Sequence, residues 1–155
     1  MMIRIPGYRE LNITTLLLDY NGTIAVDGII RPKVRERLRK LSEFLDIYVL
    51  TADTHGTAKA QCEGLDVTVH TFPVGNAMDH KREILDRIGG ECCVCLGNGR
   101  NDVKMFEAAA LSIGIMDKEG ACSALLQAAD LCVNCTEDGL DLLLYPKRIV
   151  AGLRG

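Results

Sequence analysis

The sequence predicts an α/β protein with a three-layer, Rossmann-like fold and a mainly parallel central sheet. Runs of consecutive apolar residues, such as Leu16-Leu17-Leu18 and Ile47-Tyr48-Val49-Leu50, alternate with segments whose apolar residues recur at helical spacing. Strands that are apolar on both sides are typical of parallel sheets, because helices cover both faces. Several of these runs also end directly in polar or glycine-containing segments, which is where α/β folds place their sites.

The elements follow from these patterns in chain order. Strands are expected over residues 13–18, 47–50, 67–69, 92–96, 111–115 and 131–133. Helices are expected from Pro32 to about Leu45, over 55–63, 78–88, 103–110 and 119–129, and through most of 137–153 with an interruption at Pro146.

Two shorter segments flank the first strand. Residues 4–12 either add an edge hairpin or cover the core, while a glycine-centred turn within 24–30 predicts a small β-hairpin flap. No linker, repeat or low-complexity segment divides the chain. Residues 1–155 are therefore expected to form a single domain.

Composition excludes several classes of protein. The formal net charge of −3 gives no global attraction to nucleic acid, so no nucleic-acid partner is expected. No apolar run approaches the roughly 20 residues of a membrane span, and the N-terminus lacks the apolar core of a signal peptide. We therefore expect a soluble, cytoplasmic protein with no membrane partner.

The seven cysteines do not predict a disulfide framework, because their number is odd and no export signal is visible. Most are expected to pack as small apolar side chains. Cys132 and Cys135 have CxxC spacing. One such pair is weak evidence for a metal or redox site, so their role is left open.

Reactive side chains follow three of the expected strands. Asp19 follows the first, Thr51 the second, and an Asn/Asp cluster at 98–102 the fourth. In a parallel sheet these loops meet at one edge. A carboxylate can attack phosphorus, cations and hydrogen-bond donors can stabilise the developing charge, and carboxylates suit Mg²⁺. The sequence thus predicts phosphoryl-transfer chemistry there.

Four motifs in order make the prediction specific. They are Asp19-Tyr20-Asn21-Gly22-Thr23, Thr51-Ala52-Asp53, Lys81, and Gly97-Asn98-Gly99-Arg100-Asn101-Asp102. The chain resembles the haloacid dehalogenase-like superfamily in these motifs. It is most similar to the phosphorylation domain of P-type ATPases and its free-standing soluble relatives.

The resemblance implies a role for each motif residue in binding or transferring a phosphoryl group, with Mg²⁺ as cofactor and a phosphorylated substrate of unknown identity. The implied catalytic residues are Asp19 as nucleophile, Asn21, Thr51 and Lys81. The implied metal ligands are Asp19, Asn21 through its carbonyl, Asn98 and Asp102. The implied phosphate contacts are Asp19, Gly22, Thr51, Ala52, Lys81 and Asn101.

Two amides depart from the pattern of the superfamily. Its phosphatases carry an acid/base Asp where this chain has Asn21, and the first Asp of the last motif is replaced here by Asn98. An amide does not exchange protons at neutral pH, so slower hydrolysis of an aspartyl-phosphate is expected. The main hypothesis is a Mg²⁺-dependent phosphohydrolase or phosphotransferase. The alternative is a catalytically weak binding or regulatory module.

The spacing of the motifs also predicts an open site. Residues 24–50 and 54–80 are taken up by the expected strands and helices, which leaves no room for an inserted cap domain. An open site suggests a large substrate, a protein partner, or a lid supplied by a homo-oligomer. The basic helix 31–40 is either a solvated face or a docking surface for an acidic partner.

Structural alternatives remain for three motifs. Thr51 could cap the helix expected near His55, Lys81 could be an exposed helix lysine, and Asn101-Asp102 could be a plain helix cap. Asp53 is expected to order its loop rather than perform chemistry.

Overall fold

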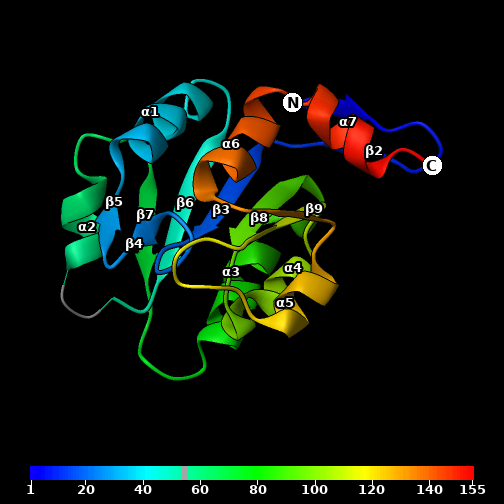
Figure 1. Cartoon of the computed structure of the whole chain (residues 1–155). Coiled ribbons are helices and arrows are strands. Elements are labelled where there is room, and N and C mark those ends of the chain that lie inside the picture. Colours follow the sequence, from blue (N-terminus) through cyan, green and yellow to red (C-terminus); the bar gives the residue numbers. More distant parts are fainter. Residues whose placement is uncertain (54–55) are drawn as a thin grey trace.

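The computed structural model describes residues 1–53 and 56–155, and a six-stranded parallel sheet forms its middle layer (Figure 1). The strand order across the sheet is β10-β9-β8-β3-β6-β7, and every neighbouring pair is parallel. The strands are β3 (Thr15–Asp19), β6 (Asp46–Thr51), β7 (Thr68–Thr71), β8 (Cys93–Gly97), β9 (Leu111–Ile115) and β10 (Leu131–Val133). The predicted α/β class is confirmed.

The central strand β3 shows why the sheet is covered on both sides. Leu16 and Leu18 belong to one buried apolar cluster, whereas Leu17 belongs to another. Successive side chains of a strand point to opposite faces, so each cluster fills the space between the sheet and one layer of helices.

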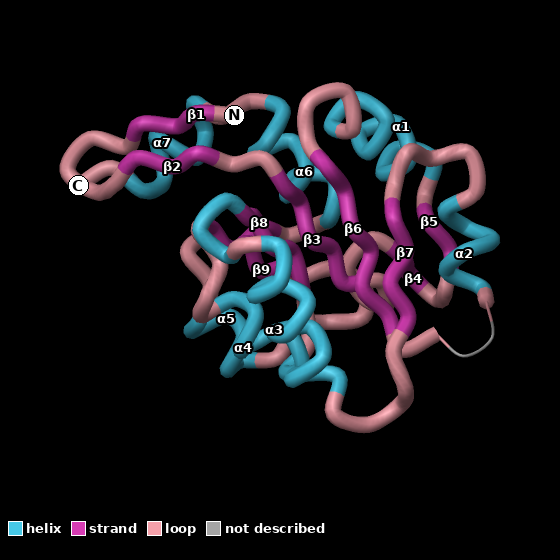
Figure 2. The backbone as a smooth tube through the Cα atoms, turned by 180° about the vertical axis from the view of Figure 1, so that it is seen from behind, coloured by secondary structure: helices cyan, strands magenta, loops and turns pink. Residues whose placement is uncertain are grey.

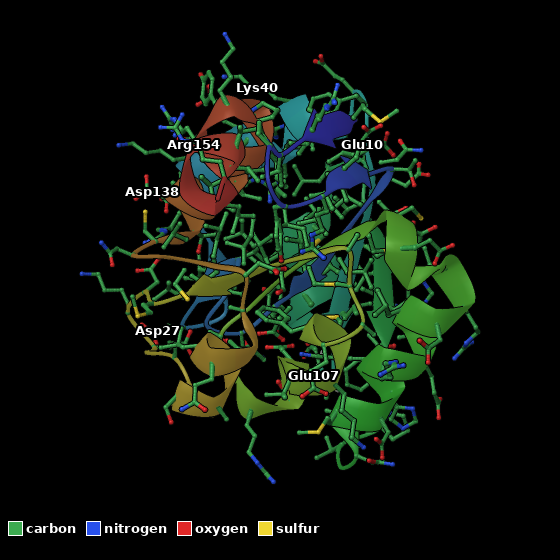
Figure 3. All side chains as sticks on the ribbon, turned by 90° about the vertical axis from the view of Figure 1, so that its right-hand side faces the viewer. Glu10, Asp27, Lys40, Glu107, Asp138 and Arg154 are labelled. Atoms are coloured by element: carbon green, nitrogen blue, oxygen red, sulfur yellow. The ribbon has the colours of Figure 1, made fainter. Side chains whose placement is uncertain are left out.

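The two helical layers follow from these clusters and are visible from both sides of the molecule (Figures 1 and 2). One layer holds α1 (Pro32–Leu41), α2 (Thr57–Cys62), α6 (Thr136–Leu144) and α7 (Lys147–Leu153). The other holds α3 (Ala77–Ile88), α4 (Val103–Phe106) and α5 (Ser123–Ala128), with short 3-10 turns η1 (Gly90–Cys92) and η2 (Arg100–Asp102). In Figure 3, Lys40 of α1 lies toward the top of the molecule and Glu107, directly after α4, lies in its lower half.

The order of the strands creates a topological switch point beside β3. The chain runs from β3 outward to β6 and β7, then returns to the other side of β3 and continues through β8, β9 and β10. Open α/β sheets bind ligands at such a point, beyond the carboxyl ends of the strands. The loops after β3 and β8 flank it.

Two hairpins lie outside the sheet. Strands β1 (Met2–Arg4) and β2 (Glu10–Asn12) pair at the N-terminus. Of the two alternatives for residues 4–12, the structure therefore shows the hairpin. The flap predicted within 24–30 is also confirmed, as the pair β4 (Ala25–Val26) and β5 (Ile29–Ile30). Its turn uses positive φ angles at Asp27 and Gly28.

The flap is anchored from below by Tyr20. This side chain is buried, and its hydroxyl donates a hydrogen bond of 2.7 Å to the carbonyl of Gly28. Burial raises the pKa of Tyr20 to about 12, so the hydroxyl remains a donor at neutral pH.

Several predicted elements have different ends. The helix expected over 103–110 ends at Phe106, because the amide of Ala110 already bonds to Cys93 and Gly90 on the way into β9. The helix expected over 119–129 begins only at Ser123, after a turn with positive φ at Gly120. The helix expected from position 55 begins at Thr57, and Thr54 and His55 lie outside the described residues.

The motif-bearing part of the fold contains no inserted domain among the described residues. Between Thr23 and Thr51 lie only the flap and α1, and between Asp53 and Lys81 only α2, β7 and the start of α3. Within the described part of the chain, none of the helices combines the length and apolar character needed to cross a membrane.

Candidate active site

The motif residues meet at the carboxyl edge of the sheet. Asp19 is the last residue of β3 and stands in register with Leu50 of β6, so Thr51, the last residue of β6, lies just beyond it. On the other side, β8 ends at Gly97 and opens into the loop that carries Asn98. The sequence predicted this meeting from strand ends alone.

Lys81 connects two of the carboxylates. Its side chain is 1% exposed, and its Nζ lies 2.5 Å from Asp19 Oδ1 and 2.6 Å from Asp102 Oδ1. Asn101 Oδ1 accepts a longer hydrogen bond of 3.4 Å from the same amine. A lysine on the exposed side of a helix would show none of these contacts, so that alternative is wrong.

The cluster holds one more negative charge than positive charge when all three groups are ionised. Burial and the neighbouring Asp19 carboxylate raise the pKa of Asp102, although Lys81 opposes this shift. Burial alone would lower the pKa of Lys81, but the two carboxylates outweigh it and hold that pKa above its ordinary value. The arrangement therefore favours an additional cation near the two carboxylates.

Thr23 links the first and last motifs. Its buried hydroxyl lies 3.0 Å from Asp19 Oδ2 and 3.3 Å from Asn98 Oδ1. The hydroxyl of Thr136, on α6, bonds in turn to the carbonyl of Thr23. The motif included Thr23 without giving it a role, and Thr136 lies too far along the chain for any local pattern to indicate it.

Asn98 is held through both its side chain and its backbone. Its Nδ2 donates a hydrogen bond of 3.0 Å to the carbonyl of Gly120. Its backbone carbonyl accepts a hydrogen bond of 2.8 Å from the amide of Cys122. The side chain also lies against Gly22, where a Cβ atom would collide with it. Gly22 has a positive φ as well, so this position requires glycine for two reasons.

The first motif also shapes the flap. The amide of Gly22 donates 2.9 Å to the carbonyl of Ala25. Asn21 forms a β-bridge with the same residue, and its side chain is exposed. Asn21 thus stands at the mouth of the site, outside the buried cluster.

Thr51 and Asp53 form the opposite wall. Thr51 is buried, and its Oγ1 accepts 3.1 Å from the amide of Asp53. Among the described residues nothing accepts the hydroxyl hydrogen of Thr51, which leaves it available to a ligand. Asp53 Oδ2 accepts 2.6 Å from the amide of Ala58 in α2, so Asp53 orders its loop as predicted. Half-buried Ala52 packs against the apolar cluster that contains Leu17.

The alternatives for Thr51 and Asp102 resolve differently. Thr51 ends a strand and α2 follows Gly56, so Thr51 is not a helix cap. Asp102 both caps a turn and belongs to the site. Its Oδ2 accepts a hydrogen bond of 3.0 Å from the amide of Gly99, while its Oδ1 binds Lys81. Gly97 makes room for this carboxylate, since a Cβ there would lie 2.5 Å from Asp102 Oδ2.

The donor set fits a hard divalent cation. Asp19, Asp102 and the side-chain oxygen of Asn98 offer only oxygen, which Mg²⁺ prefers. The excess negative charge points the same way. In the part of the chain that the structure describes, no group of three or more His, Cys, Asp or Glu side chains is arranged to hold a metal. Two carboxylates suffice for Mg²⁺, which usually keeps several waters.

The cysteines form no comparable site. All seven are free thiols, and Cys132 is exposed while Cys135 is half-buried. Burial raises the pKa of both thiols, which disfavours the thiolate form that binds metals. Within the described residues, the CxxC pair therefore has no support as a metal site.

The arginines of the basic helix form more contacts within the protein than either of the two predicted readings implies. Arg37 binds Asp141 through two hydrogen bonds of 2.8 and 2.9 Å, and Arg35 donates to the carbonyls of Gln61 and Glu63. Arg31 pairs with two carboxylates, Asp117 and, at 2.8 Å, Glu137. These arginines join α1 to its neighbours, so the reading as a solvated face is wrong for them and less charge remains for a partner.

Solved structures with a similar fold include several phosphatases. The 3-deoxy-D-manno-octulosonate 8-phosphate phosphatase from Moraxella catarrhalis, in complex with magnesium, phosphate and KDO, matches with a TM-score of 0.73 at 13% identity, over 90% of this chain and 92% of that chain. The cobalt-bound deoxy-D-mannose-octulosonate 8-phosphate phosphatase from Haemophilus influenzae matches with a TM-score of 0.73 at 15% identity, over 88% and 90%. An apo phosphoserine phosphatase matches with a TM-score of 0.66 at 19% identity, over 86% and 98%.

The chain has the haloacid dehalogenase-like fold. The likeness to P-type ATPases stays a prediction from the motifs. Among the described residues, the chain combines this fold with a short hairpin flap and has no cap domain.

Sequence comparison finds two archaeal relatives. Uncharacterized protein MJ0072 of Methanocaldococcus jannaschii is 59% identical over 39 residues, which are 25% of this chain and 89% of that protein. The chain belongs to the same family as MJ0072. Uncharacterized protein MJ0073 of the same organism is 38% identical over 61 residues, 39% of this chain and 66% of that protein. No family model matches the sequence.

Proposed function

We propose that this protein is a Mg²⁺-dependent phosphohydrolase or phosphotransferase that forms an aspartyl-phosphate on Asp19. The observation that carries the proposal is the buried bridge from Lys81 to Asp19 and Asp102 at the switch point of the sheet. The phosphatases that share the fold support phosphoryl chemistry in general. The site residues are our own assignment.

The proposed first step is attack by an Asp19 carboxylate oxygen on the phosphorus of the substrate. A P–O bond to Asp19 forms as the P–O bond to the leaving group breaks, and the leaving oxygen takes a proton from solvent. The ammonium of Lys81 and the free hydroxyl hydrogen of Thr51 face the developing charge on the phosphoryl oxygens. Exposed Asn101 and the backbone near Gly22 and Ala52 complete the proposed phosphate contacts.

The proposed cation ligands are Asp19, Asp102, the carbonyl of Asn21 and Asn98. A bound Mg²⁺ would neutralise charge on the phosphoryl group and screen it from the carboxylates. Thr23, whose single hydroxyl group lies nearer Asp19 Oδ2 than Asn98 Oδ1, would hold the Asp19 carboxylate in place for this binding. Lys81 would keep the Asp102 carboxylate oriented through its hydrogen bond to Oδ1.

Asn21 sets the expected rate. Its exposed amide stands where the phosphatases carry an acid/base Asp. General acid/base groups contribute about 10²–10⁴-fold in rate. We therefore expect slow hydrolysis, an accumulating phosphoenzyme, and a preference for substrates whose leaving group needs no proton.

The test is direct detection of the phosphoenzyme. Protein incubated with Mg²⁺ and acetyl phosphate or 4-nitrophenyl phosphate should gain one phosphoryl group on Asp19, seen by mass spectrometry of acid-quenched peptides. The Asp19→Asn variant should gain none. Absence of both labelling and turnover across Mg²⁺, Mn²⁺ and Co²⁺ would refute the proposal.

A second candidate is a binding or regulatory module that keeps the fold with little catalysis. The observation that favours it is the use of the Asn98 amide as a structural link to Gly120. Changing Asn21 to Asp separates the two candidates. A large rise in hydrolysis would show that the site is competent and limited by the amide, whereas no change would favour the binding module.

The partners remain predictions. The groove beside the site is open, so a large phosphorylated substrate, a protein partner or a second copy of the chain could cover it. The exposed apolar side chains of Ile29 on the flap and Val74 before α3 are consistent with such a cover.

A further inference from the structure

A groove of about 580 Å³ leads away from the candidate active site. It lies between the start of α3 and the turn η2. Its lining residues are Asn76, Ala77, Met78, Asp79, Gly99, Arg100, Asn101 and Lys104. Pockets of this size accept small organic molecules.

The groove is connected to the proposed nucleophile through Asn101. This residue lines the groove, and its Oδ1 lies 3.4 Å from Lys81 Nζ. The same Nζ lies 2.5 Å from Asp19 Oδ1. A substrate with its phosphoryl group at Asp19 would therefore extend its leaving group toward this groove.

The three charged side chains of the groove are not equivalent. Lys104 pairs with Asp79 at 2.5 Å, which satisfies both. Arg100 is exposed, and no hydrogen bond or ion pair holds its guanidinium anywhere in the part of the chain that the structure describes. It contrasts with Arg31, Arg35 and Arg37, whose guanidinium groups are all engaged.

The backbone that carries Arg100 is well fixed. Arg100 begins η2, and two residues later Asp102 is fully buried and bonded to both Lys81 and the amide of Gly99. A free guanidinium on a fixed turn beside an anion-transferring site is suited to a second anion. Arginine binds carboxylates and phosphates through two parallel hydrogen bonds, which gives geometric selectivity.

We infer that the leaving group of the substrate carries its own anionic group, a carboxylate or a second phosphate, and that Arg100 binds it in the groove. This inference rests on the proposed function. It assigns substrate specificity to Arg100, which lies between the proposed metal ligand Asn98 and the proposed phosphate contact Asn101, in a site that no cap domain covers among the described residues.

The experiment compares two isosteric esters, 4-carboxyphenyl phosphate and 4-carbamoylphenyl phosphate. The measured quantity is the ratio of their kcat/KM values for the wild type and for Arg100→Gln. The ratio should favour the carboxylate in the wild type, and Arg100→Gln should lower it about 10- to 100-fold, mainly through KM. The variant Arg100→Glu should lower it further.

The control is Arg87→Gln, which removes an exposed arginine from the far end of α3. It should leave the ratio as in the wild type. Thermal unfolding of each variant verifies that the fold is intact. A 4-phosphonobenzoate titration of the Asp19→Asn variant, with and without Arg100→Gln, separates binding from turnover.

The outcomes distinguish the two proposals. A ratio near one that Arg100→Gln does not change, in a protein that forms phospho-Asp19, would overturn this inference alone. Binding of 4-phosphonobenzoate that depends on Arg100, without any phosphoryl transfer to Asp19, would support the anion site and overturn the proposed function. Absence of both binding and transfer would overturn both.

Discussion

Two groups of charges in this molecule have the same imbalance but different surroundings. At the sheet edge, Lys81 faces Asp19 and Asp102 with side-chain exposures of 1%, 10% and 0%. Between α1 and its neighbours, two arginines face three carboxylates with exposures between 6% and 32%. The second group consists of Arg31, Arg37, Asp117, Glu137 and Asp141.

The difference lies in what balances the extra negative charge. Water reaches the α1 group and screens its charges, so that group needs no further partner. Water is largely excluded from the Lys81 cluster, where an uncompensated charge is costly. We therefore expect the buried cluster to gain a cation or to share a charge with a ligand, whereas the half-buried α1 group joins helices.

The largest expected effect comes from removing the extra charge at its source. Asp19→Asn should lower phosphoryl transfer by about 10³-fold or more, because the nucleophile is lost. In EDTA the same variant should unfold at a higher denaturant concentration than the wild type, since Lys81 and Asp102 then form a balanced pair. Phosphoenzyme labelling and urea denaturation measure the two effects. A marked loss of stability would contradict the claim of an excess buried charge.

Removing the Lys81 ammonium group tests the positive charge of the buried cluster. Lys81→Met should lower the free energy of unfolding by about 3–5 kcal/mol in EDTA, because two buried carboxylates lose their partner. Added Mg²⁺ should recover part of this loss. Lys104→Met is the matched control, since its pair with Asp79 is exposed and should contribute less than about 1 kcal/mol. Equal losses in the two variants would remove the distinction between the groups.

Asn98→Asp sharpens the comparison by adding a carboxylate to the cluster. The variant loses the donor to Gly120 and places a second oxygen against that carbonyl, so metal-free stability should fall by about 1–3 kcal/mol. Affinity for Mg²⁺ should rise because a carboxylate replaces an amide oxygen. Thermal unfolding in EDTA and in a Mg²⁺ series measures both. Asn134→Asp, at an exposed asparagine, is the control. An Asn98→Asp variant as stable as the wild type would show that the hydrogen bond from Asn98 to Gly120 contributes little to stability.

The smallest effect on stability is expected in the half-buried α1 group. Arg37→Gln removes two hydrogen bonds to Asp141, yet it should cost only about 1 kcal/mol or less, and the cost should shrink in high salt. Urea denaturation at low and high ionic strength measures it, with Arg39→Gln as the control. A cost near that of Lys81→Met would mean that the α1 group is as strongly desolvated as the site.

Much of the fold could be predicted because the apolar runs are unambiguous. Leu16-Leu17-Leu18 identifies a strand covered on both faces, and the alternation with helical spacing leaves few topologies. The ends of helices were less predictable. Residues 107–110 have good helix-forming composition, but the hydrogen bonds of Ala110 to the neighbouring loop and strand decide where α4 ends.

Three motifs of the candidate site could be located from the sequence because each begins where a strand ends, whereas Lys81 lies within α3. The contacts of the site with residues far along the chain could not be predicted. Thr136 binds the carbonyl of Thr23 across 113 positions, and Asn98 binds Gly120 through a carbonyl that has no sequence signature. The ion pairs of α1 were missed for the same reason, since a charge run does not reveal which acidic side chains lie opposite.

The central position of β3 also has a consequence during synthesis of the chain. Its partner β6 begins 27 residues after β3 ends, but its other partner, β8, begins only at Cys93. Until β8 leaves the ribosome, one edge of the most apolar strand lacks its partner and presents free backbone groups to other chains. Lys81 reaches its second carboxylate only once Asp102 is made. The emerging chain thus carries an unpaired edge of β3 until shortly before the last residue of the buried cluster is made.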